Sequence, residues 1–223
     1  LVGSEICIRD RHCDYNVAHT NVVLGLVESL VGLIPAGGGC KEMLWRWLQT
    51  PEGKENSEHA SMKVFDLIGY AITATSPNEA LPNQFFLEKD KVVINRDRQL
   101  STAIDLLNNI EGGYEKPSQP KFNLGGSAVR DKMFEKLEAL YNENKILDHG
   151  LEVGKQIAFV LSGGNTNIDN ELSEDDLYNL ELEAFMRLIQ MPKTQERIKH
   201  TLETGKPLVC LLYTSPSPRD LSS

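Results

Sequence analysis

The stretch Gly25-Leu26-Val27-Glu28-Ser29-Leu30-Val31-Gly32-Leu33-Ile34-Pro35-Ala36-Gly37-Gly38-Gly39 decides our interpretation of both fold and function. Glu28 is its only charged residue, and most of its neighbours are apolar. A carboxylate among apolar residues loses hydration, so we expect the pKa of Glu28 to rise toward the range useful for proton transfer. The alternative is a solvated acid at the turn between a strand and a helix.

Three consecutive glycines, Gly37 to Gly39, close this stretch. The apolar spacing after them predicts a helix over residues 40–48. Glycine-rich backbone at the start of a helix exposes amide N–H groups. The turn is therefore predicted to receive an anion or a closely approaching substrate.

The remaining pattern predicts a mostly helical α/β chain. Short strands are expected at Val22–Leu24 and Val92–Ile94 because these runs are rich in β-branched residues. Further helices are expected from 57, from 77, and over 100–110, 128–142, 145–161, 173–190 and 194–204. Three serines are predicted to cap helix starts and one glycine to end the last helix: Ser57, Ser76, Ser173 and Gly205.

Glycine and proline mark the expected division of the chain. Residues 1–110 are interpreted as a partial domain and residues 111–126, which hold several glycines and prolines, as a linker. Residues 127–208 form a helical C-terminal region. Residues 209–223 break the pattern and are interpreted as a non-native or disordered tail.

Composition excludes several classes of partner. The chain has 223 residues and a formal net charge of -9, so nucleic acid and anionic membranes are disfavoured. No apolar run reaches the roughly 18 residues that a membrane-spanning helix needs. The four cysteines fit no zinc-ligand spacing and the five histidines share no spacing with them, so no metal site is expected.

The order of residues 25–39 resembles the second signature of the crotonase (enoyl-CoA hydratase/isomerase) family. In that family a glycine, a glutamate three positions later, Gly-x-Ile-Pro and a glycine-rich turn follow one another. The resemblance implies the C-terminal portion of a crotonase-like fold, followed by a helical extension. It also implies that Glu28 is the second catalytic glutamate and that Gly32 and Pro35 bind substrate.

The resemblance extends toward the start of the chain. It implies that Glu5 is the first catalytic glutamate, although nine positions separate Glu5 from Asp14, three more than in the family. Val2 and Gly3 then occupy the turn whose amide supports the thioester oxygen. The two carboxylates would divide the acid and base roles, because two neighbouring carboxyl groups rarely ionise together.

Residues 76–80, 90–98, 161–166 and 204–208 narrow the resemblance to one subgroup, a bifunctional 3-hydroxyacyl-CoA dehydrogenase and enoyl-CoA hydratase of fatty-acid β-oxidation. It implies that the chain is the C-terminal part of a longer protein and is inactive alone. Its substrate would be an acyl-CoA. The chain itself would bind no cofactor, and NAD would bind the absent N-terminal part. A cytoplasmic location is expected, or the mitochondrial matrix in a eukaryote.

Two other functions stay open at this point. One is an enoyl-CoA isomerase, which shifts a double bond without water. The other is a catalytically inert helical module that docks a thiolase or forms a homo-oligomer.

Overall fold

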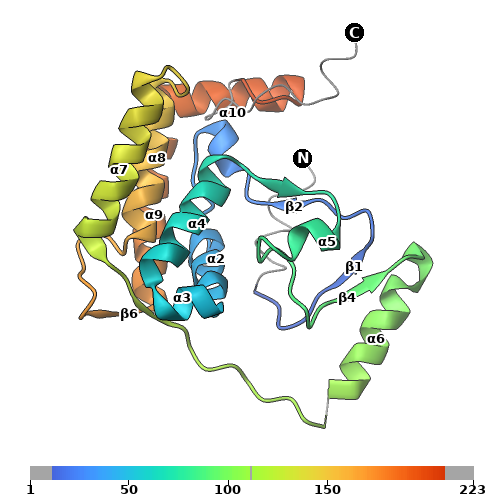
Figure 1. The fold of residues 1–223 in the computed structure, drawn as a ribbon. Helices are drawn as coiled ribbons and strands as arrows, with labels where there is room; N and C mark the ends of the chain where they lie inside the picture. The colour runs from blue at the N-terminus through green and yellow to red at the C-terminus, as the bar shows by residue number, and fades with distance from the viewer. Residues whose placement is uncertain (1–11, 111, 209–223) are drawn as a thin grey trace.

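The computed structural model describes residues 12–110 and 112–208 and shows a mixed α/β chain that is mostly helical. Figure 1 shows the longer helices gathered on one side, with α6 (Gln99–Ile110) and the short strands that precede it in the chain on the other; β6 (Glu171–Ser173) lies on the helical side. The extended chain after α6 runs beneath the molecule and returns to the helical side.

Five helices form the centre of the apolar core. Among the buried side chains that meet there are Met43 and Leu44 of the first helix, Ile68 of the second and Ile157 of the fourth. Burial of such side chains is the main stabilising contribution to the fold. These helices are α2 (Gly39–Leu48), α4 (Ser57–Gly69), α7 (Gly126–Asn142), α8 (Asp148–Leu161) and α9 (Glu174–Ile189).

Shorter elements surround this core. The 3₁₀ turn η1 (Glu28–Val31) carries Glu28 and packs against α4 and the last helix, α10 (Pro192–Thr204). The others are α3 (Pro51–Glu55), α5 (Pro77–Ala80) and the 3₁₀ turn η2 (Arg96–Arg98).

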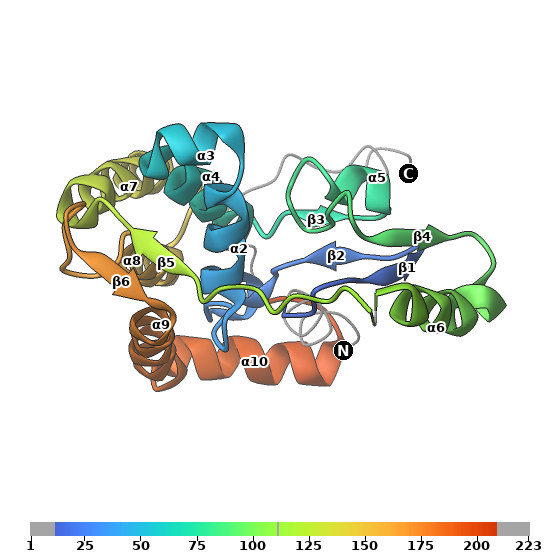
Figure 2. The ribbon, with the colours of Figure 1, turned by 90° about the horizontal axis from the view of Figure 1, so that it is seen from below.

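The described strands form three separate two-stranded sheets, seen from below in Figure 2. β1 (Val17–His19) and β4 (Lys91–Val93) are parallel, with Ala18 opposite Val92. The two antiparallel pairs are β2 (Leu24–Gly25) with β3 (Thr73–Ala74) and β5 (Lys121–Asn123) with β6 (Glu171–Ser173). The expected α/β class is therefore confirmed, whereas these small sheets do not establish a crotonase-like fold.

Local signals predict several helix ends correctly. Ser173 and Asp176 form the reciprocal hydrogen bonds of a capping box at the start of α9, and Gly205 ends α10 in the left-handed conformation. Ser57 is the first residue of α4, and the cap is the preceding Asn56, whose side chain accepts from the amide of Glu58. A shift of one residue is common because several polar side chains can cap.

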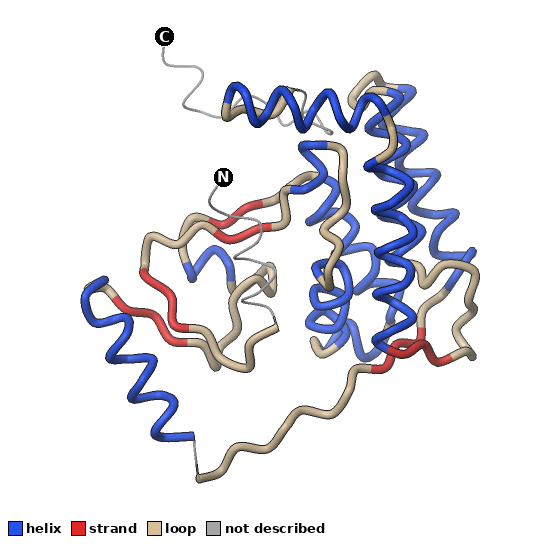
Figure 3. Tube along the Cα trace, turned by 180° about the vertical axis from the view of Figure 1, so that it is seen from behind, coloured by secondary structure: helices blue, strands red, loops and turns tan. Residues whose placement is uncertain are grey.

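The predicted linker 111–126 contains structure that the sequence pattern does not reveal. Its residues Lys121–Asn123 form β5, and Phe122 is fully buried beside the ring of Trp45. The tube in Figure 3 shows the loop that precedes β5 crossing from α6 to the helices. One apolar core takes side chains from both sides of this segment. Whether residues 1–110 and 127–208 are separate folding units stays a prediction.

Gly126 offers a test of close backbone packing. Its φ is +58°, and an added Cβ would lie 1.7 Å from the carbonyl oxygen of Thr166. Gly37 has a φ of +79° and open space around it, so it is the matched control. Gly37→Ala should cost roughly 1–2 kcal/mol through backbone strain alone. Gly126→Ala should cost on the order of 3 kcal/mol or more, because the backbone must also move.

Urea unfolding of both variants measures these free energies. Equal losses for the two variants would contradict the packing argument, since only Gly126 meets a neighbouring backbone.

Candidate functional site

Glu28 begins η1 and is half-buried, with both carboxylate oxygens shielded from solvent. Leu26 and Ile34 are buried on either side of this turn and anchor it in the core. After burial and the charge of Glu181, the charge of the Glu28 carboxylate also raises the pKa of the thiol of Cys40, the second residue of α2. The predicted acid is thus held in a shielded turn close to the start of a helix.

Three elements hold the η1 turn in place. Ser29 donates its hydroxyl to the carbonyl of Ile68 at 2.8 Å, which ties the turn to α4. Gly32 ends the turn with φ +83°, and its carbonyl accepts from the Thr194 hydroxyl of α10 at 3.1 Å. An added Cβ at Gly32 would lie 2.8 Å from Nε2 of His149. Only glycine satisfies both the backbone angle and this contact.

His149 completes a buried polar chain behind the turn. Its Nε2 lies 2.9 Å from the Thr194 hydroxyl. Because the single proton of that hydroxyl goes to Gly32, Nε2 of His149 must be the donor. Burial, followed by the positive charges of Arg197 and Lys193, lowers the pKa of His149 to about 4. The imidazole is therefore neutral at neutral pH and positions the turn as an uncharged donor.

The glycine-rich turn before α2 does receive an anion, and the anion is the protein's own Glu181. Its carboxylate accepts from the amide of Gly38 at 2.6 Å and from the amide of Lys41 at 2.8 Å. Pro35 contributes its carbonyl, which accepts from the amide of Cys40 at 3.1 Å. The expectation that an external ligand meets these amides is corrected accordingly, because α9 fills the position with a side chain.

Glu181 is almost fully buried, and opposing effects act on the pKa of its carboxyl group. Burial raises the pKa of Glu181 to about 7, and the amides of Lys41 and Gly38 oppose this rise. A helix N-terminus favours negative charge. Burial of Cys40, together with the negative charges of Glu181 and Glu28, raises the pKa of its thiol well above the ordinary value. Cys40 is therefore a protonated, unreactive core residue.

Lys41 is a second buried charge beside this carboxylate. Its ammonium pairs with Glu42 and Glu174 and lies 4.9 Å from the ring centre of Tyr178. Burial lowers the pKa of Lys41, but the hydrogen bonds from Glu174 and Glu42 outweigh that effect, and the net pKa is raised. The lysine therefore stays charged and connects α2 to the start of α9.

A large open cleft lies next to this cluster. It has a cavity volume of about 1080 Å³ and extends from Glu42 and Trp45 on α2 to Phe86, Lys89 and Lys116. Glu28 does not line it. The lining mixes aromatic rings with charges of both signs, so it favours no single class of ligand by itself.

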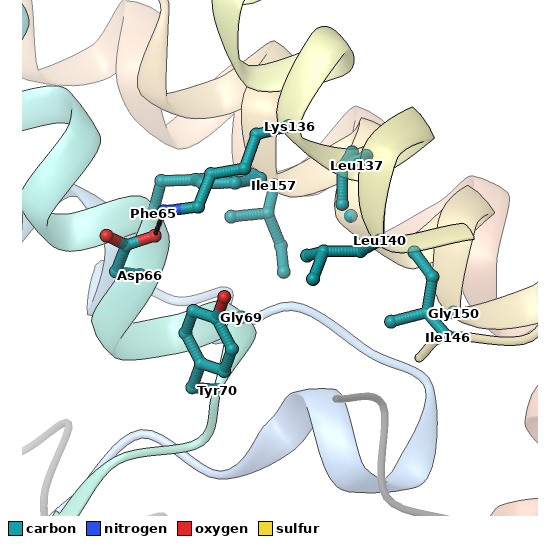
Figure 4. Close-up of a pocket in the computed structure, with 11 residues that line it drawn as sticks. Phe65, Asp66, Gly69, Tyr70, Lys136, Leu137, Leu140, Ile146, Gly150 and Ile157 are labelled. Atoms are coloured by element: carbon teal, nitrogen blue, oxygen red, sulfur yellow. Dashed lines mark hydrogen bonds and ion pairs between the residues drawn. The ribbon is translucent and has the colours of Figure 1, made fainter. Parts of the chain in front are cut away.

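A smaller hollow lies between α4, α7 and α8 (Figure 4). Its walls are almost entirely apolar, from side chains such as Phe65, Leu137 and Ile157. Asp66 and Lys136 form an ion pair at its edge. The space holds about one water molecule, which is too little for an acyl chain. The hollow is a packing gap in the core.

The other predicted site residues divide into two groups. Gly32 and Pro35 are described and have structural contacts, and their role in binding substrate stays a prediction. Glu5, Val2 and Gly3 lie outside the described residues. Within residues 12–110 and 112–208, no group of three or more His, Cys, Asp or Glu side chains is placed to hold a metal ion. In the same ranges, no helix is long and apolar enough to cross a membrane.

The polar residues that organise the site are ones that the sequence pattern does not single out. Glu181 lies in the middle of an amphipathic helix whose other acids lie in its first turn or on its exposed face, and His149 and Thr194 belong to different helices. One signal is present in the sequence. Glu181 lies one helical turn from Leu177 and Ala184, on the apolar face of α9, where an acid is unexpected.

Comparison with known proteins gives one informative relative. No protein-family model matches the chain. The chain is 32% identical over 207 residues to a protein of Bacillus subtilis (strain 168) named probable 3-hydroxyacyl-CoA dehydrogenase. The match covers 92% of this chain and 26% of that protein, so the chain spans about a quarter of the length of this relative.

This relative corrects the family assignment. The sequence resemblance places the chain in the crotonase family, with a hydratase and dehydrogenase protein as its parent. The relative is named a dehydrogenase, and its name carries no hydratase or crotonase function. The crotonase assignment is therefore wrong, and the supported relationship is to a 3-hydroxyacyl-CoA dehydrogenase.

Glu181→Ala tests the carboxylate at the start of α2. The variant leaves buried amides without an acceptor, so unfolding at pH 5, where the raised pKa of Glu181 still favours the fold, should require on the order of 2–3 kcal/mol less than in the wild type. Glu183→Ala is the control, because Glu183 is an exposed residue of the same helix that pairs with Arg187. Such a surface pair contributes under about 0.5 kcal/mol. Similar losses in chemical denaturation of the two variants would contradict the assigned role.

His149→Gln tests the neutral imidazole. A folded-state pKa of about 4, against an ordinary 6.5, stabilises the fold above pH 6.5, and this contribution is lost as the pH falls through 4. The stability difference between wild type and variant should therefore shrink by about 3 kcal/mol from pH 7 to pH 4. Unfolding by urea along this pH series measures it, and a constant difference would show that His149 is not shifted.

Proposed function

We propose that this chain is part of a protein that acts on acyl-CoA thioesters in fatty-acid β-oxidation and oxidises 3-hydroxyacyl-CoA with NAD. The observation that carries the proposal is the similarity over 207 residues to a protein named for that oxidation. The similarity runs through η1, α2 and the C-terminal helices, since it covers 92% of the chain.

The residues described here do not fit the NAD site of such a protein. A dinucleotide site needs a parallel sheet whose first strand leads through a glycine-rich turn into a helix. The described parallel sheet has two strands of three residues each, and Thr20 and Asn21 follow β1 without glycine. We place NAD binding in polypeptide outside these 223 residues and assign no redox step to the residues described.

Glu28 remains the acid–base candidate within the chain. Its shielded carboxylate and its turn, held by α4 and α10, suit a group that must keep one position relative to a thioester. Glu5 is its proposed partner, with Val2, Gly3, Gly32 and Pro35 as the proposed substrate-contacting backbone. A thiolase partner or a homo-oligomer stays a prediction.

The test uses the longer protein that contains this chain. Short, medium and long 3-hydroxyacyl-CoA substrates should each be tried with NAD, and NADH formation followed by absorbance. Turnover should require the CoA thioester, so the free 3-hydroxy acid is the control. If no chain length gives NADH, the proposed function fails. Turnover of a 2-enoyl-CoA without any formation of NADH would likewise contradict the proposed function.

Glu28→Gln in that protein keeps the shape of the side chain and removes its acidity. The 3-hydroxyacyl-CoA and the 2-enoyl-CoA are offered separately. A loss of at least a hundredfold in kcat with one substrate would assign the carboxylate to the step that consumes it, a size typical of acid–base groups. Unchanged kcat with both substrates would remove Glu28 from the site.

A further inference from the structure

Helix α6 is amphipathic, yet none of its residues is buried. Half-buried Ala103, Leu106 and Ile110 line a groove with Tyr15 and Val17 beside β1. Leu100 and Leu107 line the same groove, and with Ile104 they are largely open to solvent: Leu100 is 73%, Ile104 49% and Leu107 62% exposed. Figure 1 shows α6 standing apart from the other helices. A helix of this length has little stability in water unless its apolar face is covered.

The neighbouring sheet is also small and partly uncovered. β1 and β4 form a parallel pair, and parallel strands occur almost only in larger sheets covered on both faces. Val92 and Ile94, which alternate with the buried Val93, are 46% and 84% exposed. Val92 pairs with Ala18 and therefore lies on the opposite face of the sheet from Val17, which lines the groove of α6. The exposed apolar side chains of the helix itself, Leu100, Ile104 and Leu107, are hereafter called the α6 surface.

We propose that the α6 surface is an intramolecular interface, covered by polypeptide of the same protein outside these 223 residues. The occupant should present an apolar face to α6. The length of the relative supports this choice, because about three quarters of that protein lies outside the matched region. The inference rests on one part of the proposed function, that the chain belongs to a longer protein, and it does not depend on which reaction that protein catalyses.

A second copy of this chain fits the surface less well. A standard interface between separate proteins takes roughly 20–30 residues from each side, and the α6 surface offers three apolar side chains. A covalently attached segment needs fewer contacts, since its effective concentration is in the millimolar range for short linkers. A small surface of this kind is therefore sufficient within one protein.

Hydrogen–deuterium exchange tests the proposal without any activity measurement. Amides of residues 99–110 should exchange at least tenfold more slowly in the longer protein than in the 223-residue chain. Equal exchange in both would overturn the proposal. Protection that appears in the 223-residue chain as its concentration rises would overturn it too, because a second copy would then cover the surface.

A pair of substitutions sharpens the test. Leu107→Glu and Leu202→Glu change leucines of almost equal exposure, 62% and 64%, on α6 and α10. Both variants of the 223-residue chain should unfold at the wild-type temperature. In the longer protein only Leu107→Glu should return the exchange of 99–110 to the rate of the 223-residue chain. Retained protection in that variant would contradict the interface, and failure of the dehydrogenase assay would not affect this result.

Discussion

The structure depends on one buried carboxylate. Glu181 reaches from α9 to the first amides of α2, across 143 positions in the sequence between it and Gly38. It thereby joins the glycine-rich turn near the start of the chain to the C-terminal helices. The turn can approach a carboxylate because Gly38 takes a φ of +96°, which leaves its amide accessible. The ion pair between Lys41 and Glu174 depends on the same contact, because it brings the start of α9 alongside α2.

The sequence predicts local structure well and long-range polar contacts poorly. The capping box at Ser173, the end of α10 at Gly205 and the helix after Gly39 depend on neighbours within a few residues, so the pattern reveals them. β5 depends on Phe122 meeting α2 and on pairing with β6, fifty positions away, and its glycine- and proline-rich surroundings suggest a linker. The family resemblance followed the order of residues in one short stretch, and the relative corrects the function that this order implied.

The candidate site shows the same division. The sequence singles out Glu28, and the structure shields its carboxylate in a 3₁₀ turn. The residues that fix this turn come from α4, α8 and α10, and no spacing in the sequence relates them to Glu28. Any chemistry at Glu28 would therefore depend on the C-terminal helices. His149 and Thr194, which belong to these helices, are buried against Gly32.

Glu181 and His149 also oppose each other in the pH dependence of stability. The pKa of Glu181 rises from 4.5 to about 7 on folding, so its contribution is complete below pH 4.5 and is lost as the pH rises through 7. The pKa of His149 falls from 6.5 to about 4, so its contribution grows over nearly the same interval. Their slopes have opposite signs and largely offset between pH 4.5 and 6.5. Because the two slopes offset each other, burying both Glu181 and His149 in the core adds little net pH dependence to the free energy of unfolding between pH 4.5 and 6.5.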